Sequence, residues 1–483
     1  MMQQQQRFRF FELLVIIISL WMTSPSTAFS VVRSPSRTSL SASTLLTLKA
    51  VRDANMKKAY EQQPPHAGCH FRPTHPLSLK GPRKSKRFFE GWYYRITLPQ
   101  TNISFAFIFS IEDPFEGSNL SLSCHQIMGP NDEYLVQADP DHTKFWALQG
   151  QQALGCVFEG DSSQAGLDSD DFDTKVKSGF QMLPNRLQGK LVGHDGSLGG
   201  VYAGQGVSGT CEYDFDITPI AGWGDTTLGQ KSTAGWLASY AVFEPHWQVT
   251  MADARVTGSV TWKGDTYTFE DVPFYAEKNW GGAFPIKWYW CQCNSFDGFT
   301  DKHNTLSVTA GGGTRKIPLG QTESLGMVSV HYNGTFYEAT PWLGDMEWNI
   351  SPWGYWNMTG RCTGGARPFE VRLEATCDAP GVKLRAPTEK DGMAYFCRDS
   401  FLGDVTLSLW ELEWNAEINA HVRGKCVIDG ATSKQAAVEL GGGPWWDNWK
   451  DTSVMKQPMK GMVRLPYRFA HLRKRLFSRK RKA

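Results

Sequence analysis

The chain has 483 residues, of which 41% are hydrophobic, 13% aromatic and 20% charged, so it can bury one large or two medium cores. The formal net charge is only +2 and the basic residues gather at the two ends, which argues against a nucleic-acid surface between them. The ten cysteines include no CxxC pair, which disfavours a zinc site and indicates mostly reduced core thiols, with structural disulfides as the alternative.

The N-terminal segment has the composition of a targeting sequence. In residues 1–28, basic residues precede an apolar run too short to span a membrane, and a small-residue site follows, as in a signal peptide. Residues 29–49 contain no Asp or Glu and are rich in Ser and Thr, as in an organelle transit segment. Together they resemble the bipartite presequences of algae whose plastids are reached through the secretory route. Ordinary secretion is the alternative, and it should add glycans at triplets such as the one at Asn102.

The middle of the chain has the pattern of an all-β protein. After a short helical pattern at 50–60, stretches such as 88–98 and 103–113 are aromatic, β-branched and bounded by Pro or Gly. Many such stretches at roughly even spacing predict antiparallel barrel or sandwich units with few short helices. A soft boundary near residue 235 separates an N-terminal β domain (50–235) from a C-terminal β domain (236–450).

Three other kinds of segment have patterns that indicate a function only weakly. The acidic loop 159–178 lacks the spacing of a calcium-binding EF-hand. The glycine triplets 311–313 and 441–443 are followed by neither Lys-Ser/Thr nor a helical pattern, so we expect strand-end turns or bulges rather than phosphate cradles. The tail 451–483 is basic and partly apolar, which fits either contact with an anionic lipid surface or a solvated disordered segment.

The stretch 244–294 interleaves aromatic and titratable side chains at an unusual density. Period two places Tyr275 and Glu277 on one strand face and Lys278 on the other, and separates His246 from Trp247. The alternative explanation for Glu277 and Lys278 is a structural ion pair, or charges at the rim of the sheet.

No serine elbow, P-loop, dinucleotide fingerprint or HExxH motif occurs, so hydrolase, nucleotide and dehydrogenase functions lack support. No metal site is expected, because the histidines at 66, 70 and 75 lack an accompanying carboxylate cluster.

Several motifs resemble, in order, those of the tocopherol cyclase family over about residues 64–450: FFEGWYYRITLP, EPHWQ, YAEKNWGGAFPIKWYWCQCN, TAGGG, SPWGYW, LRAPT, CRDS and AAVELGGGPW. The acidic loop, an added segment near 299–304 and the basic tail depart from the pattern. The resemblance implies tandem lipocalin-like β units and a plastid enzyme of vitamin E biosynthesis, associated with thylakoids or plastoglobules. It implies a cofactor-independent isomerase (an intramolecular lyase) that cyclises phytyl-benzoquinols, which are prenylated hydroquinones, to chromanols.

The implied reaction protonates the nearest double bond of the prenyl tail, and the phenol oxygen then captures the cation. Glu277 is the first candidate for the acid, because Tyr-x-Glu places a phenol beside a carboxyl. A similar Tyr-x-acid triplet is part of the resemblance to the carotenoid hydratases. His246 would orient that acid or take the phenolic proton. The remaining candidates are Asp271, Glu244 and Tyr275 for catalysis, and Trp247, Trp280, Trp288, Trp290, Glu90 and Trp92 for substrate binding. The alternatives are a non-catalytic prenylquinone or carotenoid carrier, and a carotenoid hydratase-like enzyme in which water captures the cation.

Overall fold

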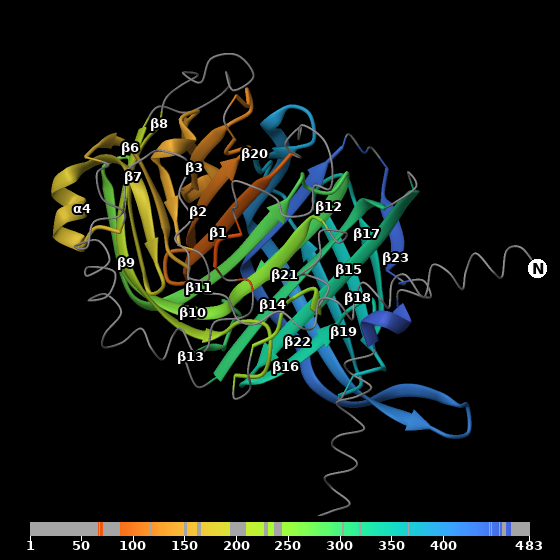
Figure 1. Ribbon diagram of the computed structural model, residues 1–483. Coiled ribbons are helices and arrows are strands. Elements are labelled where there is room, and N and C mark those ends of the chain that lie inside the picture. The colour runs from red at the N-terminus through yellow and green to blue at the C-terminus, as the bar shows by residue number, and fades with distance from the viewer. Residues whose placement is uncertain are drawn as a thin grey trace, which may run out of the picture. The chain divides into compact units, whose positions relative to one another are not determined.

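The computed structural model describes residues 66, 68–70 and 87–464, with gaps at 116, 149–151, 162–165, 194–208, 227–229, 236–243, 302–303, 318–320, 366, 444, 446, 454 and 456–459 (Figure 1). The expected signal peptide, transit segment and short helix, His75 and the end of the basic tail all lie outside these residues. Within the described ranges, no helix is long and apolar enough to cross a membrane.

The first sheet has eleven antiparallel strands in the order β4-β3-β2-β1-β11-β10-β9-β8-β7-β6-β5. Its central strands β1, β11 and β10 are rich in aromatic and β-branched residues, which suit a pleated surface buried on both faces. The strands are β1 (Phe89–Leu98), β2 (Ile103–Glu112), β3 (Leu122–Met128), β4 (Tyr134–Asp139), β5 (Phe145–Ala147), β6 (Leu154–Gly160), β7 (Val176–Leu183), β8 (Arg186–Gly193), β9 (Gly209–Ala221), β10 (His246–Trp262) and β11 (Asp265–Gly281).

The second sheet has twelve strands, ten of them in the order β16-β15-β14-β12-β22-β21-β19-β18-β17-β23, with β13 paired to β14 and β20 to β21. The strands are β12 (Lys287–Cys293), β13 (Thr300–Asp301), β14 (Asn304–Ile317), β15 (Gln321–Tyr332), β16 (Thr335–Ala339), β17 (Gly344–Ile350), β18 (Tyr355–Cys362), β19 (Phe369–Thr376), β20 (Val382–Thr388), β21 (Gly392–Asn415), β22 (Ala420–Gly442) and β23 (Trp449–Ser453).

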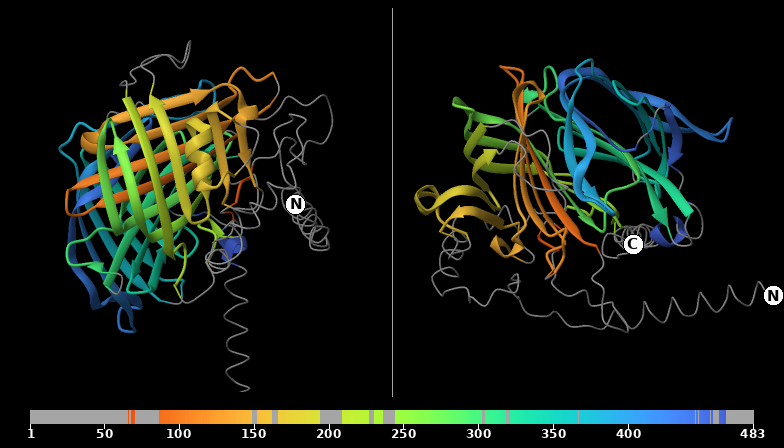
Figure 2. Two further views of the ribbon diagram at one scale, coloured as in Figure 1. Left: turned by 90° about the vertical axis from the view of Figure 1, so that its left-hand side faces the viewer. Right: turned by 90° about the horizontal axis from the view of Figure 1, so that it is seen from above.

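These two curled antiparallel sheets confirm the all-β prediction (Figure 2). The described helices are short: η1 (Pro130–Asp132), η2 (His142–Lys144), α4 (Ser169–Lys175) and a helical segment at 460–464. The chain passes from the first sheet to the second between Gly281 and Lys287, since β10 and β11 still pair within the first. The domain boundary near residue 235 stays a prediction, and the change of sheet comes later in the sequence.

Three large apolar cores pack on the faces of the two sheets. The first contains Tyr94, Phe107 and Phe274 and is built mainly from strands of the first sheet. A second core, around Trp348 and Leu407, is built only from residues of the second half of the chain. The third contains residues of both sheets, with Tyr275 from β11 and Trp288 and Trp290 from β12. The two sheets therefore share an interface core, and that core surrounds the candidate site.

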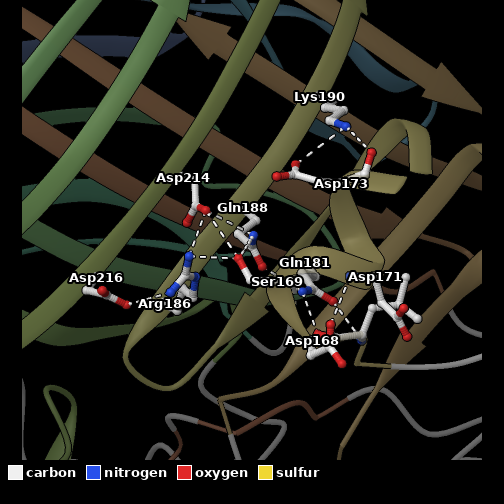
Figure 3. A network of polar contacts seen from close by, with 11 residues as sticks. Asp168, Ser169, Asp171, Asp173, Gln181, Arg186, Gln188, Lys190, Asp214 and Asp216 are labelled. Carbon is white, nitrogen blue, oxygen red and sulfur yellow. Dashed lines mark hydrogen bonds and ion pairs between the residues drawn. The ribbon is translucent and has the colours of Figure 1, made fainter. Parts of the chain in front are cut away.

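Asp168, Asp171 and Asp173 of the acidic segment lie at and in helix α4 (Figure 3). Asp168 caps helix α4 by accepting from the backbone N–H of Asp171 at 2.8 Å. On the neighbouring strands, Arg186 pairs with Asp214 at 2.7 Å. Among the described residues, no group of three or more metal-ligating side chains has metal-site geometry. Asp171 pairs with Lys175 at 2.7 Å and Asp173 with Lys190 at 3.5 Å, so these acids have local structural partners.

The glycines at 311–313 correct one expectation. They are neither a turn nor a bulge, because they lie in the middle of β14 and pair in continuous register with β12 and β15. A Cβ on Gly312 would lie 2.7 Å from the Tyr289 ring, so the position clears space for an aromatic side chain from the neighbouring strand. At Gly441 in β22, a Cβ would overlap the ring of Trp288. Glycine is needed at both positions because large rings cross the strand there.

The cysteine prediction is confirmed. All ten cysteines are free thiols, and nine are buried. Cys426 is the exposed exception. The buried thiols behave as small apolar residues of the cores.

Candidate functional site

A cavity of about 240 Å³ lies where the two sheets meet. Its wall is mostly apolar, with the few polar groups that an orienting site needs. Trp247, Trp288 and Trp290 contribute indole rings, and Met327 and Met393 contribute flexible apolar side chains. The polar residues of the wall include Tyr93, Ser110, Gln126, Glu277, Asn279, Arg315, Arg385 and Glu439.

Glu277 reaches this cavity from β11 and is held by four donors. Its Oε2 accepts from the Tyr275 hydroxyl at 2.5 Å, the Trp247 indole at 2.8 Å and the Trp290 indole at 3.0 Å. The Asn279 amide donates to Oε1 at 3.3 Å. The two oxygens are thus unequal, because Oε2 is saturated by strong donors and Oε1 has one long contact. A proton on the neutral acid therefore belongs on Oε1.

Burial and hydrogen bonding act on Glu277 in opposite directions. Burial raises the pKa of the carboxyl above its usual value, because a charge is poorly solvated there. The donors from Tyr275, Trp247, Asn279 and Trp290 oppose that shift, since each stabilises the anion. The pKa remains raised. Such a group keeps its proton better than an exposed glutamate, and its anion is well stabilised once the proton leaves.

Strand register explains how these groups meet. In the β1–β11 pairing, Tyr93 lies directly opposite Glu277, and in the β10–β11 pairing, Trp247 lies opposite Asn279. Opposed residues of an antiparallel pair share a face. The predicted common face of Tyr275 and Glu277 is confirmed by their hydrogen bond. Trp290 approaches the same carboxyl from the second sheet.

Glu439, which sequence reasoning missed, is a second carboxyl of the cavity wall. It lies on β22 of the second sheet, and its Oε1 accepts from the Trp288 indole. Burial raises the pKa of Glu439 to about 7, the Trp288 hydrogen bond opposes the shift, and the charge of Glu277 adds to it. The sequence signal was a lone acid within the apolar run AAVEL.

Lys278, Glu90 and Trp280 lie on the opposite face of the first sheet from Glu277. Lys278 Nζ lies 2.5 Å from Glu90 Oε1, and both side chains are fully buried. Lys278 also donates to the Gly68 carbonyl at 2.7 Å, and the backbone N–H of His70 donates to Glu90 at 2.9 Å. Burial alone would raise the pKa of Glu90, but Lys278 and His70 outweigh it and hold the pKa at about 2. Lys278 thus pairs with Glu90 rather than with Glu277.

His246 belongs to that same face. Its ring stacks on Trp280 with centroids 4.8 Å apart, and burial, with the nearby His70 and His66, lowers its pKa to about 3. Within the described part of the chain, no hydrogen bond joins His246 to Glu277. The expected separation of His246 from Trp247 is confirmed, since Trp247 donates to Glu277. His246 is thus a neutral stacked ring.

The other expected site residues divide between the cavity and the rest of the fold. Tyr275 is fully buried behind Glu277, which it contacts. Asp271 is exposed at a β11 position with φ 51°, and Glu244 packs beside Gly281. Trp92 borders the cavity, but its ring lies under Lys278, at 5.4 Å, on the opposite face. Glu90 and Trp280 do not line the cavity.

Comparisons with known proteins agree with one another. A family model described as "Tocopherol cyclase-like" matches residues 86–442. A protein of Oryza sativa subsp. japonica named "Probable tocopherol cyclase, chloroplastic" is 38% identical over 416 residues, which cover 83% of this chain and 83% of that one. The Zea mays "Tocopherol cyclase, chloroplastic" is 38% identical over 419 residues, covering 83% and 82%. The solved structure of kievitone hydratase from Nectria haematococca is 11% identical, with a TM-score of 0.38 over 80% of this chain and 92% of that one. An identity and a TM-score this low carry no functional argument.

Proposed function

The chain belongs to the tocopherol cyclase-like family, and we propose that it is a tocopherol cyclase in which Glu277 protonates the prenyl double bond of a phytyl-benzoquinol. The phenol oxygen of the same molecule then captures the cation and closes the chromanol ring. Atoms are rearranged and none is lost, so the enzyme is an isomerase whose reaction balances without a redox partner. The single observation that carries the assignment of the acid is the four-donor arrangement around Glu277 in an aromatic cavity.

The hydrogen bonds to Oε2 explain how a buried acid can still give up its proton. Burial favours the neutral form of Glu277 before reaction, and Oε1, which has the fewer donors, is the oxygen that would carry the proton. As the proton moves to the alkene, negative charge develops on the carboxyl, and the Tyr275 hydroxyl and two indoles already point at it. Donors placed where charge develops stabilise the transition state more than the ground state. A positioned acid of this kind typically contributes ~10²- to 10⁴-fold in rate.

The tryptophan wall supports the cation that protonation creates. Trp247, Trp288 and Trp290 offer ring faces that cannot form a bond to a tertiary cation, at roughly 0.5–2 kcal/mol each. The same rings exclude water, which would otherwise capture the cation and give an alcohol. Burial of the tail contributes about 0.8 kcal/mol per CH₂. That term is equal in ground and transition states, so it sets affinity rather than rate.

The enzyme acts in the plastid, and we propose that a bipartite presequence takes it there and that it works at a thylakoid or plastoglobule surface. Its prenylated substrate resides in lipid, which supports a lipid-facing element. The long β21–β22 hairpin projects from the second sheet (Figure 1). Near its turn, Trp414 is 56% exposed and Ile418 is 62% exposed, so the hairpin tip offers two large apolar side chains to a lipid surface.

Incubation of the purified protein with a phytyl-benzoquinol under reducing conditions tests the proposed function. Chromanol formation is expected. A tertiary alcohol would instead indicate a hydratase in which water captures the cation. Substrate recovered unchanged, although bound, would indicate a carrier, and either result would overturn the cyclase assignment.

A further inference from the structure

The carboxyl of Glu439 is unusual for its place in the fold. On β22, Ala436, Val438 and Leu440 point into the core of the second sheet, so the residues between them face the first sheet. Ala437 belongs to the interface core, as that alternation requires. Glu439 is therefore an acid on an apolar strand face, directed at the cavity. A carboxyl in such a place is costly unless it has a function or a partner.

Glu439 and Glu277 are linked through neighbouring tryptophans of β12. Trp290 lies directly opposite Glu439 in the β12–β22 pairing, and its indole donates to Glu277 at 3.0 Å. Trp288, two residues earlier, donates to Glu439. One strand thus supplies an indole N–H to each carboxyl. The two acids approach the same cavity from opposite sheets, as groups on two sides of one substrate would.

The Tyr93 hydroxyl lies in the wall between them. Tyr93 opposes Glu277 in the β1–β11 pairing, and its ring contacts Trp290 at a centroid distance of 5.3 Å. Its hydroxyl is buried yet has no hydrogen-bond partner among the described residues. Burial raises its pKa, and negative charge on Glu277 or Glu439 acts in the same direction. A buried donor without a partner is rare, and here it faces a cavity that a hydroxylated substrate would fill.

Electrostatics favour one negative charge on the pair. Each carboxylate disfavours ionisation of the other, because like charges in a buried site repel. Asp399, directly opposite Glu439 on β21, is fully buried with its pKa well above the usual range, so it stays neutral and adds no further charge. Two ionised carboxylates in one buried site are therefore disfavoured, and a pair with one proton is the state that acid–base catalysis requires.

From this geometry we infer that Glu439 is the general base that removes the phenolic proton of the substrate. The inference rests on the proposed function and adds the second half of its proton transfer. The O–H bond of Glu277 breaks and a C–H bond forms on the tail. The phenol oxygen then forms the C–O bond, and its proton passes to Glu439.

The cycle closes when that proton returns to Glu277. After one turnover Glu439 is protonated and Glu277 is ionised, so the pair has exchanged roles. Among the described residues the Tyr93 hydroxyl has no hydrogen bond to either carboxyl, so the proton returns to Glu277 by exchange after the chromanol leaves. No external proton is consumed, as an isomerisation demands. The base has a pKa near 7, close to the value at which a base works best near neutral pH.

The test compares kcat/KM against pH for the wild type, Glu439→Gln and Trp288→Phe, with a phytyl-benzoquinol as substrate. The wild type should give a bell-shaped profile, because one carboxyl must be ionised and the other protonated. Glu439→Gln should lose ~10²-fold or more and lose the acid-side fall in activity, since only protonation of Glu277 is then required. Glu439→Asp should recover part of the rate.

Trp288→Phe covers the case in which Glu439→Gln fails to fold. It keeps an aromatic ring but removes the indole donor, so the pKa of Glu439 should rise and the acid-side limb should move to higher pH. Near-wild-type turnover of Glu439→Gln with both limbs intact would overturn the inference. If Glu439→Gln instead lost the fall in kcat/KM at alkaline pH, the inference would also be overturned, because Glu439 would then be the acid. Absence of chromanol from the wild type would refute the proposed function itself, which is a separate result.

Discussion

The Tyr275 hydroxyl lies 2.5 Å from Glu277 Oε2, and the two residues are separated by a single position on β11. The phenol is fully buried behind the carboxyl, so its orientation is fixed by packing rather than by substrate. It fills one lone pair of Oε2, while Oε1 has only the long contact with Asn279. This pairing makes the two ends of one carboxyl chemically different, and several measurements follow from it.

Glu277→Gln should abolish cyclisation, with a fall in kcat of ~10²- to 10⁴-fold, because an amide cannot donate an acidic proton. Substrate affinity, followed by quenching of tryptophan fluorescence, should change little. Glu270→Gln, an exposed change on the same strand, serves as the control and should behave as the wild type. A Glu277→Gln protein with near-normal turnover would remove Glu277 from the role of acid.

Tyr275→Phe should slow the reaction by roughly 10- to 100-fold, the equivalent of the ~1.5–3 kcal/mol that a hydrogen bond to a charged group is worth. The lost donor normally lowers the pKa of Glu277, so its removal should raise that pKa further. The acid must be protonated to act, and the alkaline fall in activity should therefore move to higher pH. Tyr94→Phe, on the opposite face of β1, should leave the pH profile unchanged. An unshifted Tyr275→Phe profile would contradict this account.

Gly312→Ala should destabilise the protein by about 1–3 kcal/mol and raise KM. The new methyl group would lie 2.7 Å from the Tyr289 ring, which must then move within the cavity wall. Denaturant unfolding and steady-state kinetics measure the two effects. Gly282→Ala is the matched control, because its Cβ would meet neighbours at 3.4–3.5 Å, an ordinary contact distance. Equal losses in both variants would show that the cavity geometry at Gly312 is unimportant.

Glu90→Gln should lower the free energy of unfolding by about 3–5 kcal/mol, because Lys278 would stay buried without its counter-ion. The folded pKa of Glu90 is about 2, below its usual value of 4.5. Its stabilising effect is therefore present above pH 4.5 and is lost as pH falls toward 2. Unfolding curves between pH 7 and pH 3 should show that dependence in the wild type and a weaker one in the variant. Glu389→Gln, which breaks the exposed pair with Lys316, should barely matter.

Trp414→Ser combined with Ile418→Ser should weaken binding to lipid vesicles while leaving the melting temperature nearly unchanged, since both side chains are largely exposed. Vesicle co-sedimentation measures the loss. Turnover of detergent-dispersed substrate should be normal, because the hairpin tip is not part of the cavity wall. Leu402→Ser, another exposed apolar position on β21, is the control. Unchanged sedimentation of the double variant would remove the hairpin from the lipid contact.

Period-two alternation was the most reliable sequence signal for the site. It predicted the shared face of Tyr275 and Glu277 and the separation of Lys278, because both properties depend only on neighbours along one strand. The same alternation places Trp280 on the face of Lys278. Its inclusion among the cavity tryptophans followed from local aromatic density, which says nothing about direction.

The part of the site that the sequence did not predict depends on tertiary structure. Glu439 lies far along the chain from Glu277 and on the other sheet, and no periodicity relates the two. Their proximity depends on how two curled sheets pack through Trp288 and Trp290. Gly312 gave a related but misread signal, since room for a ring on the next strand looks in sequence like an ordinary turn. The triplet 441–443 does lie at a strand end, because β22 ends at Gly442.

The contact of Gly68 and His70 with the Lys278–Glu90 pair sets a limit on maturation of the polypeptide. These residues supply a carbonyl to the ammonium group and a backbone N–H to the carboxylate. A processing protease that cut beyond residue 70 would expose one of the most deeply buried charges of the first sheet to water and leave both ions short of partners. If the proposed presequence is removed, the mature N-terminus should therefore lie before Gly68, and N-terminal sequencing of the native protein would locate it.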